Sequence, residues 1–197
     1  MRQIFRWAHA AALLTLCAGA AHAQAPIVYH DAETGVSFSY SQEWRPLNPE
    51  TDTHYLRPAI QPVHTAIVLD TNPPAPYTGT DFTGLAFSYA IGPQTTAAAC
   101  TAAITLYGAA AARPAATING RRFTAAEGGD AAMSHQIYER LYSTFANGRC
   151  YVFDLALTTG GFGARDDVRQ MSQAERDDAA RKLDAIFGTV RIATLPQ

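Results

Sequence analysis

The stretch SHQIYERLYSTFANGRCYVFDLALTTGG, residues 134–161, decides the fold because its pattern is compatible with two different structures. Its apolar residues up to Phe145 recur at helical spacing, and Gly148 is available to end such a helix. The pair Asn147-Gly148, placed before the β-rich CYVFDLALTT, is equally typical of a two-residue hairpin turn. We predict the hairpin, in the register that sets Phe145 opposite Cys150.

In this register both faces of the hairpin are apolar. One face carries Tyr138, Tyr142, Tyr151, Phe153, Leu155 and Leu157, and the other carries Ile137, Leu141, Phe145, Cys150, Val152 and Ala156. A sheet that is apolar on both faces needs a cover on each side. Two amphipathic segments can supply these covers, one at residues 95–107 and one from Ser172 to about Gly188, which opens with the capping-box pattern SQAE. We therefore predict an α+β fold, an antiparallel β-sheet with helices on both faces, in an α/β/α sandwich.

Shorter β-type runs complete the predicted sheet. They lie at residues 27–30, 35–40, 63–70 and 84–91. The pair Asn119-Gly120 predicts a further hairpin turn. Residues 45–62 contain four prolines, and we expect them to be irregular.

The N-terminus has the pattern of a secretory signal peptide. Two arginines precede a short apolar run, and small residues lead to an A-x-A site at Ala21-His22-Ala23. We expect residues 1–23 to be removed and residues 24–197 to form a single globular domain in the periplasm or outside the cell. No later segment reaches the roughly 20 apolar residues that cross a bilayer, so we expect no transmembrane segment in the mature chain.

Cys100 and Cys150 are the only cysteines that follow the signal peptide. In an oxidising compartment an even number of cysteines favours a disulfide, and these two allow one intramolecular pairing. The alternative is a catalytic thiolate beside a histidine, which requires one cysteine to stay free.

Charge argues against two classes of partner. The chain has 15 basic and 17 acidic residues. Loss of Arg2 and Arg6 with the signal peptide leaves 13 basic residues, hence a formal charge of −4, and no basic block occurs. We therefore expect no nucleic-acid partner and no anionic membrane surface as a partner.

The run GVSFSY, residues 35–40, leads into Tyr40-Ser41-Gln42-Glu43-Trp44. This aromatic strand end followed by a tryptophan, with the helices and hairpins above and a closing VRI strand, resembles the PsbP/Mog-like family, including the DcrB-like secreted bacterial proteins. Ser41 stands where that family has a proline. We expect Trp44 to fold back over the sheet and fill the core rather than to present a platform to a ligand.

The resemblance implies a function without catalysis. Members of the family serve mainly as binding or assembly factors and share no catalytic set, so no catalytic residue carries over. The expected function is that of a periplasmic or secreted binding or accessory domain, whose partner is an envelope protein or a small molecule. Neither the sequence nor the resemblance indicates a cofactor or a metal.

The candidate contact surface lies on two long proline-rich stretches. Aromatic and arginine side chains on such loops suit contact with a partner, because proline lowers the cost of ordering them. The candidate residues are His54, Tyr55, Arg57, His64, Tyr77 and Phe82. The competing interpretation is a pair of linkers packed on the sheet edge.

The second candidate function is a small hydrolytic or metal-dependent enzyme. In the hairpin register His135 and Glu139 share a face, and Asp154 lies diagonal to Glu139 on the partner strand. Imidazole and carboxylate groups so placed are suited to metal binding or acid–base work. No spacing such as H-E-x-x-H supports this reading, and the sequence specifies no reaction.

Overall fold

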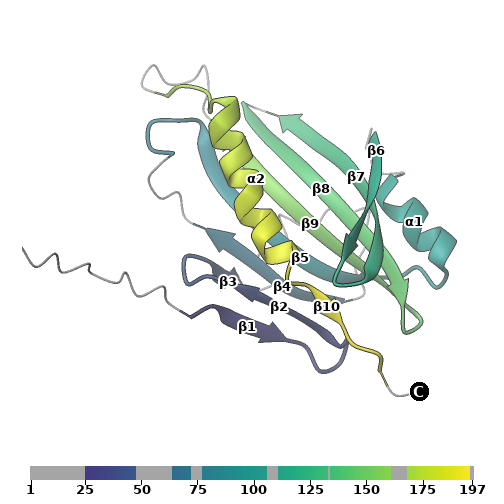
Figure 1. Ribbon diagram of the computed structural model, residues 1–197. Coiled ribbons are helices and arrows are strands. Elements are labelled where there is room, and N and C mark those ends of the chain that lie inside the picture. The colour runs from purple at the N-terminus through teal and green to yellow at the C-terminus, as the bar shows by residue number, and fades with distance from the viewer. Residues whose placement is uncertain are drawn as a thin grey trace, which may run out of the picture.

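The computed structural model describes residues 25–47, 64–71, 77–105, 111–132, 134–160 and 168–195. The predicted signal peptide, residues 1–23, lies outside these ranges. The elements within them, in chain order, are β1 (Ile27–His30), β2 (Val36–Tyr40), β3 (Arg45–Leu47), β4 (His64–Thr71), β5 (Phe82–Gly92), α1 (Ala97–Thr105), β6 (Ala111–Ile118), β7 (Arg121–Ala132), β8 (His135–Ala146), β9 (Arg149–Gly160), α2 (Gln173–Phe187) and β10 (Arg191–Ile192). Figure 1 shows their arrangement.

A seven-stranded antiparallel sheet forms the centre of the molecule, in the order β3-β4-β5-β9-β8-β7-β6. The β8–β9 hairpin has the predicted register, with Phe145 opposite Cys150. Asn147 and Gly148 in its turn have φ angles of 49° and 70°. A tight turn with both central residues at positive φ matches the twist of the two strands, which explains why the hairpin prevails over the helix. The Asn119-Gly120 turn between β6 and β7 repeats this geometry and is also confirmed.

The predicted β1–β2 hairpin is confirmed, with Tyr29 opposite Phe38, but it belongs to a separate sheet. This small sheet has the order β1-β2-β10. It packs on the large sheet through Phe38, whose ring centroid lies 5.0 Å from that of Phe87 on β5. The Tyr151 hydroxyl donates a hydrogen bond to the carbonyl oxygen of Thr34, in the β1–β2 turn, at 2.9 Å.

Helix α2 and the small sheet together cover one face of the large sheet (Figure 1). The main core lies beneath them, where Phe187 of α2 packs on Phe123 and Phe153, with ring centroids 5.2 and 5.6 Å away. Helix α2 begins with the predicted capping box: the Ser172 hydroxyl accepts from the Glu175 N–H, and the Glu175 carboxylate accepts from the Ser172 N–H. These bonds satisfy N–H groups that the first helical turn leaves without partners.

Helix α1 packs on the opposite face and is joined to β9 by the predicted disulfide between Cys100 and Cys150, which is confirmed. Both cysteines are buried, and Ile104 beside them is fully buried. The Ser143 hydroxyl of β8 donates to the carbonyl oxygen of Cys100 at 3.1 Å. The helices therefore lie on both faces of the sheet, as predicted.

Trp44 and the short strand β3 follow the small-sheet hairpin in the chain. Trp44 is 3% exposed and belongs to the main core, which confirms that it fills the core. The expectation that the chain is irregular from residue 45 is wrong for β3, because Arg45–Leu47 pair with β4. Pro46 is tolerated there since β3 is an edge strand, where a residue without an N–H group breaks no ladder.

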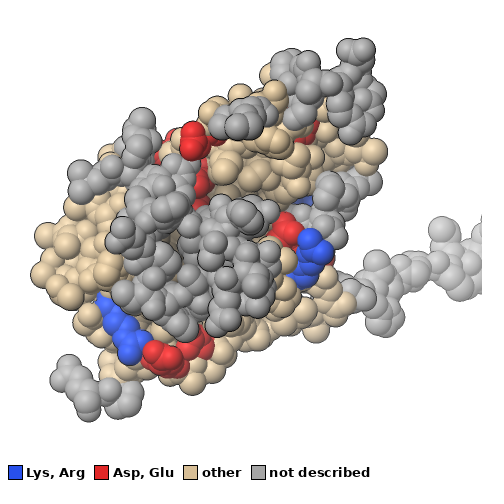
Figure 2. Space-filling model, turned by 180° about the vertical axis from the view of Figure 1, so that it is seen from behind, with Lys and Arg blue, Asp and Glu red and all other residues tan. Residues whose placement is uncertain are grey.

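Figure 2 shows the face of the molecule turned away from α2. Where described residues are visible on this face, acidic and basic side chains stand in small groups near one another. The visible described residues therefore form no extended area of a single charge on this side.

Candidate functional site

The contact surface predicted on the two irregular stretches is described only in part. His54, Tyr55 and Arg57 lie outside the described residues. His64 is the first residue of β4, and its side chain is not described. A binding role for these four residues stays a proposal.

Tyr77 and Phe82 lie in the core rather than on the surface. They are 2% and 7% exposed, and their ring centroids are 4.7 Å apart. The Tyr77 hydroxyl donates to the carboxylate of Asp178 on α2 at 2.6 Å. Burial, with this hydrogen bond second, raises the pKa of Tyr77, and the same bond lowers the pKa of Asp178. Neither ring presents enough surface to meet a partner, so both residues act as structural contacts between β5, α2 and the segment before β5.

The residues of the second candidate function are only partly brought together. Asp154 pairs with Leu141, which places it diagonal to Glu139, as predicted, on the face away from α2. Both acidic residues are almost fully buried, at 1% and 3% exposed. His135 shares their face but pairs with Gly160 at the far end of the hairpin. At a rise of about 3.3 Å per residue it lies about 13 Å along the strand from Glu139.

His135 is also exposed, whereas the two acidic residues are buried. No group of three histidine, cysteine, aspartate or glutamate side chains suited to a metal ion occurs among the described residues. The three residues therefore do not converge on one site.

A groove between α2 and strands β7, β8 and β9, here called the helix groove, has a volume of about 480 Å³. Its floor is apolar and is formed by Leu155 and Leu157 of β9 and by Ala180 and Leu183 of α2. The volume lies within the range of about 300–1,000 Å³ that is usual for small-molecule sites.

Strand alternation decides which β8 side chains face this groove. Tyr138 pairs with Leu157 and Arg140 pairs with Leu155, so both lie on the face that α2 covers. Glu139 is placed between them in sequence, and alternation puts its side chain on the opposite face of β8, although the residue also lines the groove. Asp154 is not part of this lining and lies on the face away from α2.

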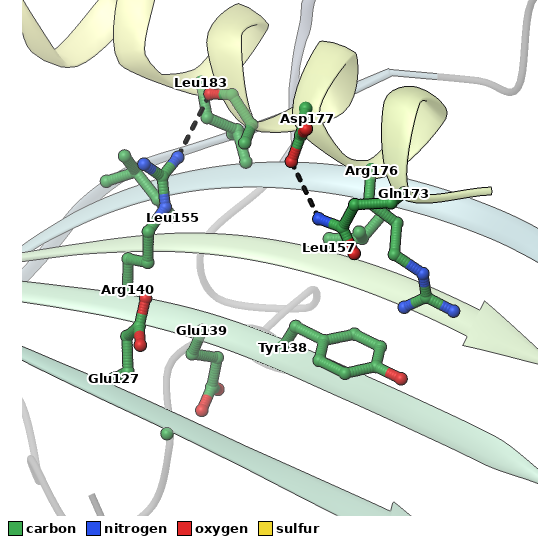
Figure 3. Close-up of a pocket in the computed structure, with 12 residues that line it drawn as sticks. Glu127, Tyr138, Glu139, Arg140, Leu155, Leu157, Gln173, Arg176, Asp177 and Leu183 are labelled. Atoms are coloured by element: carbon green, nitrogen blue, oxygen red, sulfur yellow. Dashed lines mark hydrogen bonds between the residues drawn. The ribbon is translucent and has the colours of Figure 1, made fainter. Parts of the chain in front are cut away.

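One side of the helix groove is formed by a tyrosine and an arginine. Tyr138 is 41% exposed, the largest exposure of an aromatic ring among the described residues. The guanidinium carbon of Arg176 lies 4.8 Å from the centre of the Tyr138 ring. This cation–π contact places the positive charge over one face of the ring at the opening of the groove (Figure 3).

Further polar groups around the groove are held by hydrogen bonds. Arg140 donates to Asp184 at 2.6 Å and to the carbonyl oxygen of Ala180 at 3.0 Å. The amide of Gln173 donates to Asp177 at 2.8 Å, across one turn of α2 (Figure 3). These bonds fix the rim of the groove in place.

Sequence reasoning missed this site because the apolar face of β8 and β9 was expected to be fully covered. The pattern does contain a signal. The α2 residues at positions 173, 176, 177 and 180 follow helical spacing along a stripe beside the buried one. Arg140 interrupts the apolar face of β8 between two tyrosines.

No helix among the described residues is long and apolar enough to span a membrane. The disulfide points to an oxidising compartment, since such bonds persist in the periplasm or outside the cell.

No protein-family model and no curated protein sequence matches the chain. Solved structures are similar to it at low identity and with TM-scores below 0.5. A crystal structure of a protein from Bacteroides thetaiotaomicron aligns with a TM-score of 0.44 and 11% identity over 81% of this chain. The alignment covers 46% of that protein, so the chain spans less than half of its length.

Two further structures are of similar size to this chain. The solution structure of cyanobacterial PsbP from Synechocystis gives a TM-score of 0.47 and 16% identity, over 91% of this chain and 99% of that one. LpqN is described as involved in cell envelope biogenesis of Mycobacterium tuberculosis. Its crystal structure gives a TM-score of 0.45 and 11% identity, over 86% of this chain and 91% of that one. One of the three is thus a PsbP, the family that the sequence resembles. These are similarities of fold alone.

Proposed function

We propose that the protein is a non-catalytic binding domain and that the helix groove is its ligand site. The observation that carries this proposal is the combination of an apolar leucine floor with the exposed ring of Tyr138 and the guanidinium of Arg176. An apolar cleft with a few polar groups at its edge is the usual form of a small-molecule site.

The lining also favours a role in binding. The described residues that form it include no serine, cysteine, histidine or lysine. Of its three carboxylates, Asp177 accepts from Gln173, Glu127 forms an ion pair with Arg113, and Glu139 is only 3% exposed. A serine, cysteine or lysine nucleophile and a histidine base are therefore missing from the described part of the lining.

The chemistry of the groove suggests the kind of ligand. Leu155 and Leu157 favour a small apolar body, and the exposed part of the Tyr138 ring offers it an aromatic contact. Arg176 favours an acidic group at the open end, because its guanidinium has N–H groups beyond the one that approaches Met171. A small amphiphilic anion fits both features, and the compartment proposed for it is the periplasm or the cell exterior.

Anilinonaphthalene sulfonate is a suitable probe, because it joins an apolar aromatic body to a sulfonate. We expect its fluorescence to rise on binding to the folded protein. Tyr138→Ala and Arg176→Gln should each weaken this binding several-fold, as the loss of an aromatic or arginine anchor does. Arg181→Gln is the matched control, because Arg181 lies on the exposed side of α2 and carries the same charge.

Melting curves of all three variants exclude binding to partly unfolded protein, which exposes apolar surface. If the probe binds the Tyr138 and Arg176 variants as tightly as the unchanged protein, the helix groove is not the site and the proposal fails.

A further inference from the structure

A second groove lies between the small sheet and the β6–β7 turn and is here called the arginine groove. It has a volume of about 680 Å³. The charged and hydroxyl side chains that carry its chemistry are those of His30, Ser37, Arg121 and Arg191. Arg122 also lines the groove, but strand alternation turns its side chain to the face of β7 opposite that of Arg121. It is separate from the helix groove, which lies at the other end of α2.

Three of these residues form a row across the small sheet. His30 pairs with Ser37, and Ser37 pairs with Arg191 on its other side. Neighbouring strands lie about 4.8 Å apart, so the row spans about 10 Å. Val36 and Phe38, the neighbours of Ser37 along β2, are buried in the core. Because side chains alternate along a strand, the row faces away from the core.

Arg121 approaches the same place from the large sheet. It lies two residues before Phe123, whose ring is in the core, so both side chains are on the side of the small sheet. Its guanidinium donates to the carbonyl oxygen of Ile192 at 3.4 Å. Asn119 in the preceding turn donates to the carbonyl oxygen of Val190 at 2.9 Å. These bonds attach the β6–β7 turn to β10 and hold the groove open before any ligand arrives.

The arginine groove is positive in a protein whose formal charge is −2. None of the described residues that line it is acidic. Elsewhere in the described part of the chain, arginines form ion pairs, as Arg45 does with Asp70 and Arg169 does with Glu175.

Arg121, Arg122 and Arg191 form no ion pair with any described residue. Asp31, which follows His30 in sequence, accepts hydrogen bonds from the backbone N–H groups of Glu33 and Thr34 within its own turn. The positive charge of the groove is therefore not neutralised from within the described part of the chain.

We propose that the arginine groove binds a phosphate group. Guanidinium groups present several N–H donors in a plane, which suits the oxygens of phosphate, and an imidazole and a hydroxyl can supply further donors. The volume is several times that of a water-sized site, so it has room for the organic part of a phosphate ester. The phosphate is carried either by a soluble ester or by a phospholipid headgroup.

Two probes distinguish these sources. Inorganic pyrophosphate, titrated into the purified protein by calorimetry, tests the soluble arm. Cosedimentation with phosphatidylglycerol vesicles, compared with phosphatidylcholine vesicles, tests the headgroup arm. Binding of either probe should weaken as sodium chloride is raised, because salt screens charges at a surface.

Arg191→Gln is the decisive variant, since Arg191 is exposed and its side chain forms no ion pair with a described residue. We expect it to weaken binding about tenfold, the usual scale for one charge-assisted hydrogen bond. Arg121→Gln should do the same, and its melting curve reports whether β10 has loosened. Arg181→Gln removes an equal charge far from the groove and should change binding less than about twofold.

Loss of pyrophosphate binding in Arg191→Gln, with Arg181→Gln unaffected, supports the proposal for a soluble ester. Loss of vesicle binding alone supports it for a headgroup. The proposal is overturned if neither probe binds the unchanged protein, or if Arg181→Gln weakens binding as much as Arg191→Gln. Neither outcome bears on the helix groove, which Arg191 does not line.

Discussion

Replacement of Tyr77 by alanine should destabilise the protein strongly, although the sequence places this residue in a proline-rich loop. Its side chain is 2% exposed and packs against the Phe82 ring at a tilt. Lys182 lies over the Tyr77 ring, with Nζ 5.4 Å from the ring centre. Its hydroxyl is bonded to Asp178. The ring therefore connects the residues before β5 to helix α2.

The expected loss follows from these contacts. Truncation of a buried aromatic ring to alanine costs about 3–5 kcal/mol, because apolar burial is lost and a cavity remains. For a chain of this size that corresponds to a fall in Tm of roughly 10 °C. Tyr77→Phe keeps the ring and removes only the hydroxyl, so it should cost about 1.5–3 kcal/mol, the net value of a hydrogen bond to a charged group.

Urea unfolding followed by circular dichroism measures these losses. Tyr138→Ala is the matched control, since Tyr138 is an equally large side chain that is 41% exposed. We expect this control to cost less than about 1 kcal/mol, because surface changes away from the core have small effects. The same Tyr138→Ala variant should bind the probe in the helix groove more weakly. Replacement of Tyr77 therefore affects stability, whereas replacement of Tyr138 affects binding.

The result that would refute this reasoning is a stable Tyr77→Ala protein. An unchanged urea midpoint would show that Tyr77 is a surface residue of the loop, as the contact-surface hypothesis requires. If Tyr77→Ala does not fold, Tyr77→Phe still tests the hydroxyl contact with Asp178. A Tyr138→Ala variant as unstable as Tyr77→Ala would mean that exposure does not separate the two residues.

Two further predictions concern covalent and electrostatic links. Replacement of Cys100 and Cys150 by alanine should cost about 4 kcal/mol of stability, the chain-entropy value for a closed loop of 50 residues. The urea midpoint should fall accordingly, and an unchanged midpoint would contradict this prediction. Hydrogen bonds from Arg169 and from the helix N-terminus lower the pKa of Glu175 to about 2. Because this pKa is depressed on folding, the stabilisation is complete above about pH 4.5 and is lost as pH falls towards 2. Glu175→Gln should therefore flatten the dependence of the urea midpoint on pH in this window, and equal slopes in the two proteins would rule the linkage out.

The candidate site was harder to predict from the sequence than the fold was. Tyr138 and Leu157 were placed on one apolar face by strand alternation, which is a local rule and proved correct. That Tyr138 stays 41% exposed depends on where α2 crosses the sheet, and no pattern within β8 encodes this position. For the same reason, Tyr77 could be assigned to a surface loop although it is buried.

The sequence by itself determined the elements whose causes are local. Asn147-Gly148 sets the β8–β9 register because both residues adopt positive φ in the turn, and SQAE from Ser172 starts α2 because its side chains bond the free N–H groups. Only the tertiary structure decided which segments meet. Tyr77 reaches Asp178 across 101 residues, and Arg121 reaches the β10 backbone across 71. Contacts at such separations depend on the packing of the whole chain, which leaves no short pattern in the sequence to predict them.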